Sequence, residues 1–367
     1  MESRSWNRNA EDLSPFARGA SPYEQWIATL GLPIHRGYYV EDVRTCEVGW
    51  WEERQCSAAI LVMAGQEGQS EVRVSEIPPG KSTAPVRFAM DEVVYVAQGR
   101  GLTTISTDGF PPRTFEWQKH SLFLIPPGYV HTFSNTQGDS PVRLLHYNSL
   151  PAVMERMADP KFFFKSGYSD PELLYGDGDG FYSEARVMQS TAGRGRSSYW
   201  LGNFFPNMQA WDSLLPQTGR GAGARVVWIR YPKSRILNHM AVFPSRTYKK
   251  GHRHGPGILI VIPDGEGFSY MWPEGAEKTY IPWHEGSVFV PPNDWYHQHF
   301  NISESDNRYL AFHSPNPESS DVVQIEYTEE DPVIRATFEK RLAERGLTSL
   351  MPDECYTNAG YEWTYRD

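Results

Sequence analysis

Hydrophobic and polar positions along the chain form short runs rather than long helical patterns. Runs such as DEVVYVAQGRG (91–101) and GILIVIPDGEG (257–267) are rich in Val, Ile and Tyr, and Gly, Pro, Asn and Asp punctuate them. Runs of this kind are typical of β-strands separated by turns. Many short strands with frequent turns favour an all-β sandwich or barrel over a βαβ sheet.

The pattern of strands and turns occurs twice. SLFLIPPGYVHTFSN (121–135) returns as SVFVPPNDWYHQHFN (287–301). One offset, 166 residues, relates four pairs of identical residues: Gly99 and Gly265, Pro126 and Pro292, His131 and His297, Asn135 and Asn301. A constant offset across several turn residues predicts two tandem copies of one structural unit.

Two segments outside the repeats have the signals of short helices. SPYEQWIATLG (21–31) has Ser21 as N-cap and Glu24 three residues later, and DPVIRATFEKRLAERG (331–346) begins with an Asp cap and Pro and ends at Gly. The expected organisation is an N-terminal arm (1–45), a first barrel (46–150), a linker (151–198), a second barrel (199–320) and a helical tail (321–367).

The second copy carries a histidine pattern suited to a metal. His252 and His254 alternate with Arg253, so both imidazoles leave the same face of a strand. His297 comes from a separate strand bounded by Pro. Three neutral imidazoles suit divalent Fe, Zn, Ni, Cu or Mn and leave coordination positions open. The alternative is three polar histidines on a solvent-facing sheet.

These motifs resemble those of the cupin superfamily, G-x5-H-x-H-x3,4-E-x6-G followed by G-x5-P-x-G-x2-H-x3-N. The second copy matches the first motif at His252, His254 and Gly265, and the second at Gly286, Pro292, His297 and Asn301, with Asp294 where the motif has Gly. The resemblance covers residues 70–150 and 236–315. It implies an all-β bicupin: two tandem cupin (double-stranded β-helix, or jelly-roll) barrels with short flanking helices. This fold hosts many reactions, so it does not by itself imply one.

The glutamate of the first motif is missing from the second copy. Ile258 occupies its place, seven residues before Gly265, whereas Glu92 stands seven residues before Gly99 in the first copy. Three neutral ligands leave a divalent ion with its full charge of two. Such a centre favours an anionic, bidentate substrate and can act as a Lewis acid.

An HRH sequence without the acid, followed by W-x-H-x-H, is similar to gentisate 1,2-dioxygenase and its salicylate and hydroxynaphthoate relatives. That resemblance implies a three-histidine Fe(II) centre that uses O2 to cleave aromatic rings. In those enzymes the iron lies in the N-terminal cupin, whereas the intact triad of this chain is in the C-terminal one.

The first copy retains few of the ligands. Val86, Phe88 and Glu92 stand where the second copy has His252, His254 and Ile258, and only His131 corresponds to a ligand histidine. We expect no metal there, and instead a structural role or a pocket that shapes a dimer.

Further residues are candidates for catalysis or substrate binding. His299 shares the inward face of His297 and is either a proton carrier or a partner of backbone groups. Arg308 is a candidate anchor for a substrate carboxylate, or the partner of a surface acid. The interior-facing aromatic and histidine candidates, which otherwise serve packing, are Tyr270 as a catalytic residue and His239, Trp272 and Trp295 as pocket walls.

Composition narrows the class of protein. With 40% hydrophobic and 22% charged residues the chain is globular, and its net charge of −10 argues against nucleic acid or an anionic membrane as partner. Cys46, Cys56 and Cys355 fit no disulfide framework, and no signal peptide or membrane span is visible, so we expect a cytoplasmic protein. Related bicupins imply a homodimer or homotetramer.

Three functions remain open. The first is an Fe(II)- and O2-dependent dioxygenase that acts on a small hydroxylated aromatic or enolisable acid, an anionic substrate. The second is a redox-neutral lyase, isomerase or hydrolase that uses Mn, Ni or Zn. The third is a non-catalytic cupin that binds a small molecule.

Overall fold

The computed structural model describes residues 20–165, 167–176, 178, 180–183, 185–190, 197–209, 215–216, 220–255, 257–313 and 323–363. Within these ranges the chain forms two compact units. Unit 1 contains the described parts of Met1–Gly37, Arg44–Glu184 and Asn203–Pro206, and unit 2 those of Tyr38–Val43, Ala185–Gly202 and Asn207–Asp367. No helix in the described ranges is long and apolar enough to cross a membrane.

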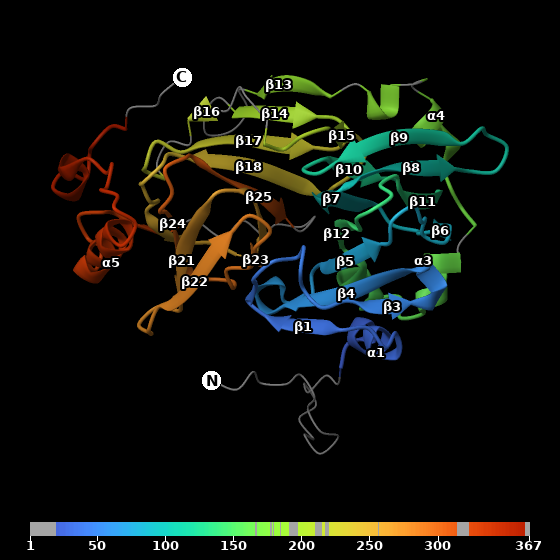
Figure 1. Ribbon diagram of the computed structural model, residues 1–367, viewed down its shortest axis with the longest axis horizontal. Coiled ribbons are helices and arrows are strands. Elements are labelled where there is room, and N and C mark those ends of the chain that lie inside the picture. The colour runs from blue at the N-terminus through green and yellow to red at the C-terminus, as the bar shows by residue number, and fades with distance from the viewer. Residues whose placement is uncertain are drawn as a thin grey trace, which may run out of the picture. The chain divides into compact units, whose positions relative to one another are not determined.

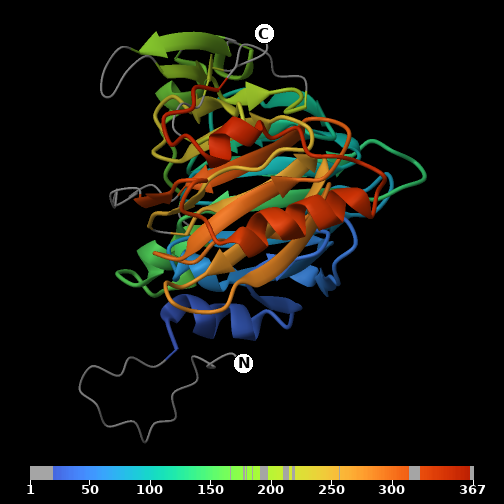
Figure 2. The same ribbon diagram turned by 90° about the vertical axis from the view of Figure 1, so that its left-hand side faces the viewer.

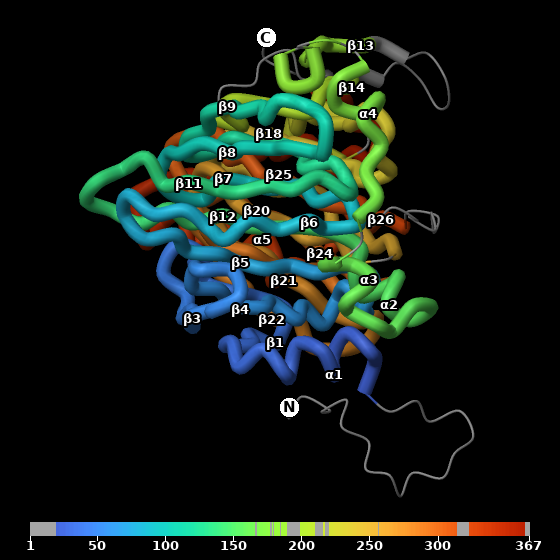
Figure 3. The backbone as a smooth tube through the Cα atoms, turned by 90° about the vertical axis from the view of Figure 1, so that its right-hand side faces the viewer, coloured from blue at the N-terminus to red at the C-terminus, as the bar shows by residue number. Residues whose placement is uncertain are grey.

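Unit 1 is built from two sheets (Figure 1). In the larger sheet the order is β1-β4-β5-β12-β7-β10-β15, and β3 pairs with β4; in the smaller it is β6-β11-β8-β9, whose strands lie side by side in Figure 3. The bounds are β1 Ile34–Gly37, β3 Gly49–Trp51, β4 Cys56–Met63, β5 Glu71–Ile77, β6 Val86–Arg87, β7 Glu92–Gln98, β8 Arg100–Ser106, β9 Arg113–Gln118, β10 Leu122–Ile125, β11 Val130–Asn135, β12 Val142–Asn148 and β15 Phe204–Phe205.

Unit 2 also has two sheets, with the orders β13-β14-β17-β18-β25-β20-β23-β2 and β22-β21-β24-β19-β26, and β16 pairs with β17. The bounds are β2 Tyr39–Val40, β13 Arg186–Ser190, β14 Ser197–Leu201, β16 Leu215–Pro216, β17 Arg225–Arg230, β18 Leu237–Phe243, β19 Gly251–Arg253, β20 Leu259–Asp264, β21 Glu266–Trp272, β22 Thr279–His284, β23 Val288–Phe289, β24 Tyr296–Asn301, β25 Asn307–His313 and β26 Val323–Ile325.

The two units repeat one topology. The order β5-β12-β7-β10 in unit 1 corresponds to β18-β25-β20-β23 in unit 2, and β6-β11-β8-β9 corresponds to β19-β24-β21-β22. The predicted duplication and the all-β fold are therefore confirmed: each unit is a jelly-roll barrel made of two facing sheets.

Both barrels also repeat one tight packing feature. A Cβ added at Gly101 would lie 2.4 Å from the Trp117 ring and 2.1 Å from the Ser134 carbonyl oxygen. In unit 2 a Cβ at Gly267 would lie 2.4 Å from the Trp283 ring. Both glycines are needed because a tryptophan lies directly over the strand.

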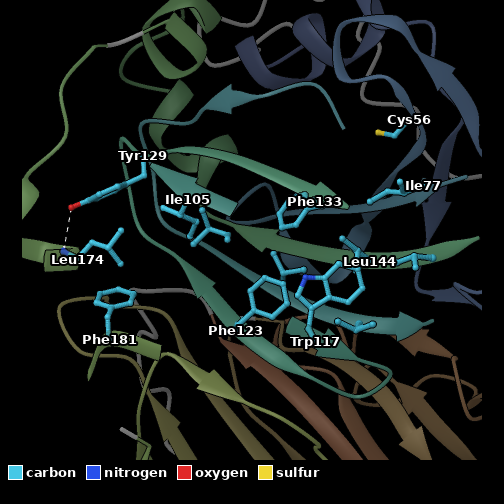
Figure 4. Packing of buried hydrophobic residues seen from close by; sticks show 14 residues of the cluster. Cys56, Ile77, Ile105, Trp117, Phe123, Tyr129, Phe133, Leu144, Leu174 and Phe181 are labelled. Carbon is cyan, nitrogen blue, oxygen red and sulfur yellow. Dashed lines mark hydrogen bonds between the residues drawn. The ribbon is translucent and has the colours of Figure 1, made fainter. Parts of the chain in front are cut away.

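Aromatic and β-branched residues fill the space between the sheets of unit 1. Phe123, Trp117 and Phe133 are almost fully buried at its centre, together with Ile105 and Leu144 (Figure 4). Tyr129 lies at one side, where its hydroxyl accepts a hydrogen bond from the Leu174 amide (3.2 Å). This packing follows from the alternation of apolar residues along the strands.

Both predicted helices are present. α1 (Pro22–Thr29) has a capping box in which the Ser21 hydroxyl accepts a hydrogen bond from the Glu24 amide (3.1 Å). α5 (Pro332–Ala343) has Asp331 as its N-cap, and its buried face packs over β21, β22 and β24 (Figure 2). The segment between the barrels contains further short helices: α2 (Leu150–Met154), α3 (Pro160–Lys165) and α4 (Pro171–Tyr175), and the 3-10 turn Gly180–Tyr182.

Candidate metal centre

Three histidines meet on the inner face of the smaller sheet of unit 2. His252 on β19 lies directly opposite His297 on β24, and side chains that face each other in an antiparallel pair project to the same side. Their ring centroids are 4.3 Å apart, and His254 lies 4.7 Å from His297. One nitrogen from each ring falls in a group whose atoms all lie within 4.8 Å of one another.

Backbone carbonyls orient two of these rings. His252 Nδ1 lies 2.9 Å from the Lys250 carbonyl oxygen, and His297 Nδ1 lies 3.1 Å from the Trp295 carbonyl oxygen. A carbonyl can only accept, so each Nδ1 carries the proton and each Nε2 keeps a free lone pair. This is the arrangement in which a neutral histidine binds a metal ion.

Burial keeps the three rings neutral. It lowers the pKa of His252 and of His297 well below the ordinary value, and neighbouring histidines add to the shift. For His254, burial and the charge of Arg220 lower the pKa to about 4. Neutral imidazoles are the form that coordinates metals, so the cluster is ready to do so near neutral pH.

No carboxylate joins the cluster among the described residues. Ile258, in the position of the motif's glutamate, is half-buried and packs against the apolar core of unit 2. The donor set is therefore three neutral nitrogens, and its chemistry fits a divalent ion with open positions. Such an ion would keep its charge of two.

Two cationic side chains lie near the histidines. Arg220 is close enough for its charge to lower the pKa of His252, His254, His297 and His299. Lys249 is 1% exposed, and its Nζ donates a hydrogen bond to the Tyr309 hydroxyl (2.8 Å). Because burial and Arg220 both lower its pKa, Lys249 gives up its proton easily for a lysine.

Two successive hydrogen bonds between side chains hold His299 beside the cluster. Its Nδ1 lies 2.7 Å from Ser269 Oγ, which accepts a hydrogen bond from the Trp283 indole (2.9 Å). Its ring is 5.5 Å from that of His297, centre to centre. His299 thus lies inward, as its spacing predicts, and its Nε2 is the nitrogen left for proton exchange.

His239 also faces the interior of unit 2. Its Nδ1 lies 2.8 Å from His313 Nε2, and both rings are buried. The Tyr309 ring lies 5.7 Å from the His239 ring and 5.6 Å from the His299 ring, centre to centre. The inner face therefore holds a group of proton-carrying side chains next to the three histidines.

Other candidate residues lie elsewhere. Tyr270 and Trp272 pair with Gln298 and Tyr296, the residues of β24 that alternate with His297 and His299. They therefore face the opposite side of the sheet, and Tyr270 packs against the aromatic layer beneath α5. The prediction that both line the interior is therefore wrong. The residues of β21 that lie opposite His299 and His297, and so share their face, are Ser269 and Met271.

Two other candidates, Arg308 and Trp295, differ in their relation to the cluster. Arg308 is next to Tyr309 on β25, and alternation puts it on the opposite face from Tyr309 and His313. It is thus not directed at the histidine cluster. Trp295 is half-buried, packs against Tyr38 with ring centres 5.4 Å apart, and places its carbonyl on His297.

The corresponding place in unit 1 has the same backbone and different chemistry. His131 on β11 lies opposite Val86 on β6, as His297 lies opposite His252. Glu92 accepts hydrogen bonds from Arg73 (2.8 Å) and Asn148 (3.1 Å) and lies 2.8 Å from His146 Nδ1. Burial alone would raise the pKa of Glu92, but Arg73 and His146 outweigh it and hold that pKa well below its usual range.

The paired topology, the matching register and the two motifs together decide the fold. The chain has a bicupin fold. No protein-family model and no curated protein matches the sequence.

Solved structures with similar folds include vicilin from Capsicum annuum (12% identity, 84% of this chain and 93% of that chain, TM-score 0.48). A variant of oxalate decarboxylase from Bacillus subtilis has 10% identity over 82% of this chain and 83% of that one (TM-score 0.48). The coconut allergen cocosin has 12% identity over 85% and 95%, respectively (TM-score 0.48). These similarities concern the fold and carry nothing about activity.

The sequence interpretation missed several side chains around the bicupin's histidine cluster. The residues that it missed lie beside the cluster and are Lys249, Arg220, Tyr309, His313 and Ser269. For His313 a signal was available, since it continues the alternation of Tyr309 and Ala311 on β25. Lys249 is three residues before His252 and lies outside β19, so alternation does not predict its place. Arg220 lies in a loop outside both motifs, and no pattern in the sequence points to it.

Proposed function

We propose that this bicupin is a metal-dependent enzyme of the second barrel, an Fe(II)- and O2-dependent dioxygenase of a small anionic substrate. The substrate class is a hydroxylated aromatic acid or an enolisable acid. The observation that carries the proposal is the cluster of His252, His254 and His297 with no carboxylate beside it in the described chain.

The charges around the cluster support an anionic substrate. A divalent ion held by three neutral nitrogens keeps two positive charges, and Arg220 adds a third nearby. Burial of this much positive charge is costly unless an anion offsets it. A substrate with a carboxylate and an adjacent hydroxyl supplies both the charge and two oxygen donors.

Each side chain has a role that follows from its contacts. His252 and His297 would hold the metal through Nε2, and His254 through one of its ring nitrogens. Bound ferrous iron would accept the substrate's oxygens and bind O2 beside it, so that electrons pass from the substrate, which is oxidised, to O2. Arg220 would pair with the substrate carboxylate, and a guanidinium fork suits that group.

Proton transfer is assigned to the inner polar group. Ser269 fixes the orientation of His299, so that its Nε2 can accept a proton from a substrate hydroxyl. Lys249 and Tyr309, which share a hydrogen bond, can relay that proton away from the histidines. The paired His239 and His313 extend the relay on the same face.

The test is oxygen consumption after anaerobic loading with ferrous ion. Full-length protein is reconstituted without oxygen and assayed at an oxygen electrode with salicylates, gentisates and β-diketones. Uptake that depends on both iron and one substrate class supports the dioxygenase. The matched control is His284→Ala, because His284 is a half-buried histidine of unit 2 outside the cluster.

A redox-neutral reaction is the second candidate, and the buried acid–base group of Lys249, Tyr309 and the paired histidines favours it. Such an enzyme would turn over the same substrates without O2 and with Zn or Mn in place of iron. Product formation under argon with zinc-loaded protein would replace the dioxygenase by a lyase, isomerase or hydrolase.

A further inference from the structure

The first barrel contains a cavity where the second has its histidine cluster. Its volume is about 30 Å³. By this measure a water molecule needs about 10–15 Å³, so the cavity has room for two or three waters or a group of similar size. Val86 and His131, the counterparts of His252 and His297, both line it.

One arginine at the cavity, Arg54, is not paired with a carboxylate of the described residues. Arg54 lies between the rings of Trp51 and Phe164, with its Cζ 5.1 Å from each ring centre. It makes no ion pair with any described carboxylate. Stacking holds a guanidinium by its faces and leaves the N–H donors at its edge free for a planar anion.

The other charged groups of the cavity are already paired. Arg73 bonds to both Glu71 and Glu92, and His146 is placed between Glu92 (2.8 Å) and Ser75 (2.7 Å). One guanidinium thus faces two carboxyl groups. Burial raises the pKa of Glu71, whereas at Glu92 the charge of Arg73 outweighs burial and lowers the pKa, so Glu92 is the carboxylate that Arg73 offsets. Arg54 forms an ion pair with neither acid and supplies the charge that a ligand would meet.

The rest of the cavity is suited to a short hydrocarbon. Phe88, Phe133 and Phe164 form aromatic walls. His131 adds one polar contact through Nε2, since its Nδ1 is within 3.4 Å of the Tyr129 carbonyl and no described residue bonds to the other nitrogen. A charged fork at one side and apolar rings at the others match a small aliphatic carboxylate.

We propose that the first barrel binds a small monocarboxylate, with Arg54 as the residue that recognises the carboxylate and the aromatic walls enclosing its carbons. The site is distinct from the histidine cluster of the second barrel and does not depend on a metal. One or two carbons is the size that the volume admits, as in formate or acetate.

The proposal is tested by titrating full-length protein with ¹³C-labelled acetate and, separately, with acetamide, with the dissociation constant read by NMR. Acetamide has the same shape without the charge, so it should bind at least tenfold more weakly. Arg54→Met should weaken acetate binding at least tenfold, because a charge-assisted hydrogen-bond pair is lost.

Arg113→Met is the matched control. Arg113 is also stacked on an aromatic ring of unit 1, 4.7 Å from the centre of Tyr175, but it does not line the cavity. It should leave binding within twofold of the wild type. Val86→Phe, which fills the cavity and keeps Arg54, should abolish binding and serves if Arg54→Met does not fold.

Two results would overturn the proposal. One is acetate binding that is unchanged in both Arg54→Met and Val86→Phe. The other is a crystal soaked in acetate whose ligand density lies at His252, His254 and His297 while the cavity of the first barrel holds water alone.

Discussion

The chemistry of the second barrel rests on which nitrogen of each histidine is free. The Lys250 and Trp295 carbonyls accept hydrogen bonds from the Nδ1–H groups of His252 and His297, and this leaves the Nε2 lone pairs free. The order of residues alone predicts that the rings share a face. It does not predict the tautomer, because the accepting carbonyls come from backbone geometry.

Removing one ring of the cluster should remove the metal. In His297→Ala the remaining two nitrogens hold a divalent ion weakly, so we expect metal content to fall from one per chain to less than about 0.1 and turnover with it. Metal analysis of protein purified without oxygen measures this. His284→Ala should keep its full metal content, and equal losses in the two variants would contradict the assignment.

Arginine recognition of the substrate separates two candidates. Arg220→Met should lower kcat/KM by about 10- to 100-fold through the lost carboxylate contact while metal content stays unchanged. Arg308→Met should lie within about twofold of the wild type, because Arg308 faces away from the cluster. Steady-state kinetics with the active substrate checks both, and the reverse order of effects would restore Arg308 as the anchor.

Strand alternation explains which site residues the sequence could predict. His299 was predicted to face inward because it shares the phase of His297, and it does so. His239, Tyr270 and Trp272 were predicted to face inward without a residue of known direction on their strands; His239 does so, whereas pairing with β24 places Tyr270 and Trp272 outside. A phase assigned without a partner strand has no reference.

In each barrel the packing of one strand requires a glycine beneath a tryptophan ring. The Trp117 indole donates to Thr103 Oγ1 (2.8 Å), and the Trp283 indole donates to Ser269 Oγ (2.9 Å). The same device thus occurs at the 166-residue offset in both units. In unit 2 it also orients His299, so a packing element of the repeat became part of the site.

A side chain at this glycine should be poorly tolerated. Gly267→Ala places a methyl group 2.1 Å from the Phe300 carbonyl oxygen, so the strands must separate and we expect a loss of about 2–4 kcal/mol in the free energy of unfolding. Urea denaturation followed by fluorescence measures it. Gly138→Ala, which meets no atom within 4 Å, should change the stability by less than about 0.5 kcal/mol.

The C-terminal helix is held by its apolar face. Phe338 is fully buried, and its ring lies 4.9 Å from that of Tyr248, centre to centre. Phe338→Ala should therefore cost about 3–5 kcal/mol of unfolding free energy. Val333 is 61% exposed on the same helix, and Val333→Ala is the control; similar melting temperatures for the two variants would show that α5 adds little.

The start and end of both predicted helices followed from local signals. Ser21 and Asp331 cap their helices through their side chains as the sequence indicates. The short helices α2, α3 and α4 were harder to predict, because segments of five or six residues carry too little periodicity.

At the scale of the whole molecule, the repeat was the most informative feature of the sequence. A constant offset indicated two barrels, and both have the same strand order. The offset could not indicate that β2, from the N-terminal arm, pairs within unit 2, or that β15 pairs within unit 1. Two-residue strands are fixed by tertiary pairing rather than by their own pattern.

His131, one of the buried histidines of the first barrel, makes stability depend on pH. Burial lowers the pKa of His131 to about 4, although Glu92 partly offsets the shift. The unfolded chain therefore binds this proton from about pH 6.5 downward while the folded chain does not, so stability falls as pH drops from about 6.5 to 4. The loss from His131 alone is about 3 kcal/mol by pH 4.

Urea titrations at several pH values test this dependence. His131→Gln should flatten the fall between pH 6.5 and 4 by about 3 kcal/mol, since Gln does not titrate. His35→Gln, an exchange on a more exposed strand of the same unit, should leave the curve as in the wild type. Parallel curves for all three proteins would assign the pH dependence to other groups.

The proposed metal centre consists of three histidines of the second barrel and no carboxylate. Anomalous diffraction at the iron edge, from crystals of protein purified anaerobically, tests it directly. We expect one peak per chain, bonded to a nitrogen of His252, His254 and His297, with no carboxylate ligand and no peak in the first barrel. A peak bonded to an aspartate or glutamate, or rings turned apart with no peak between them, would contradict it.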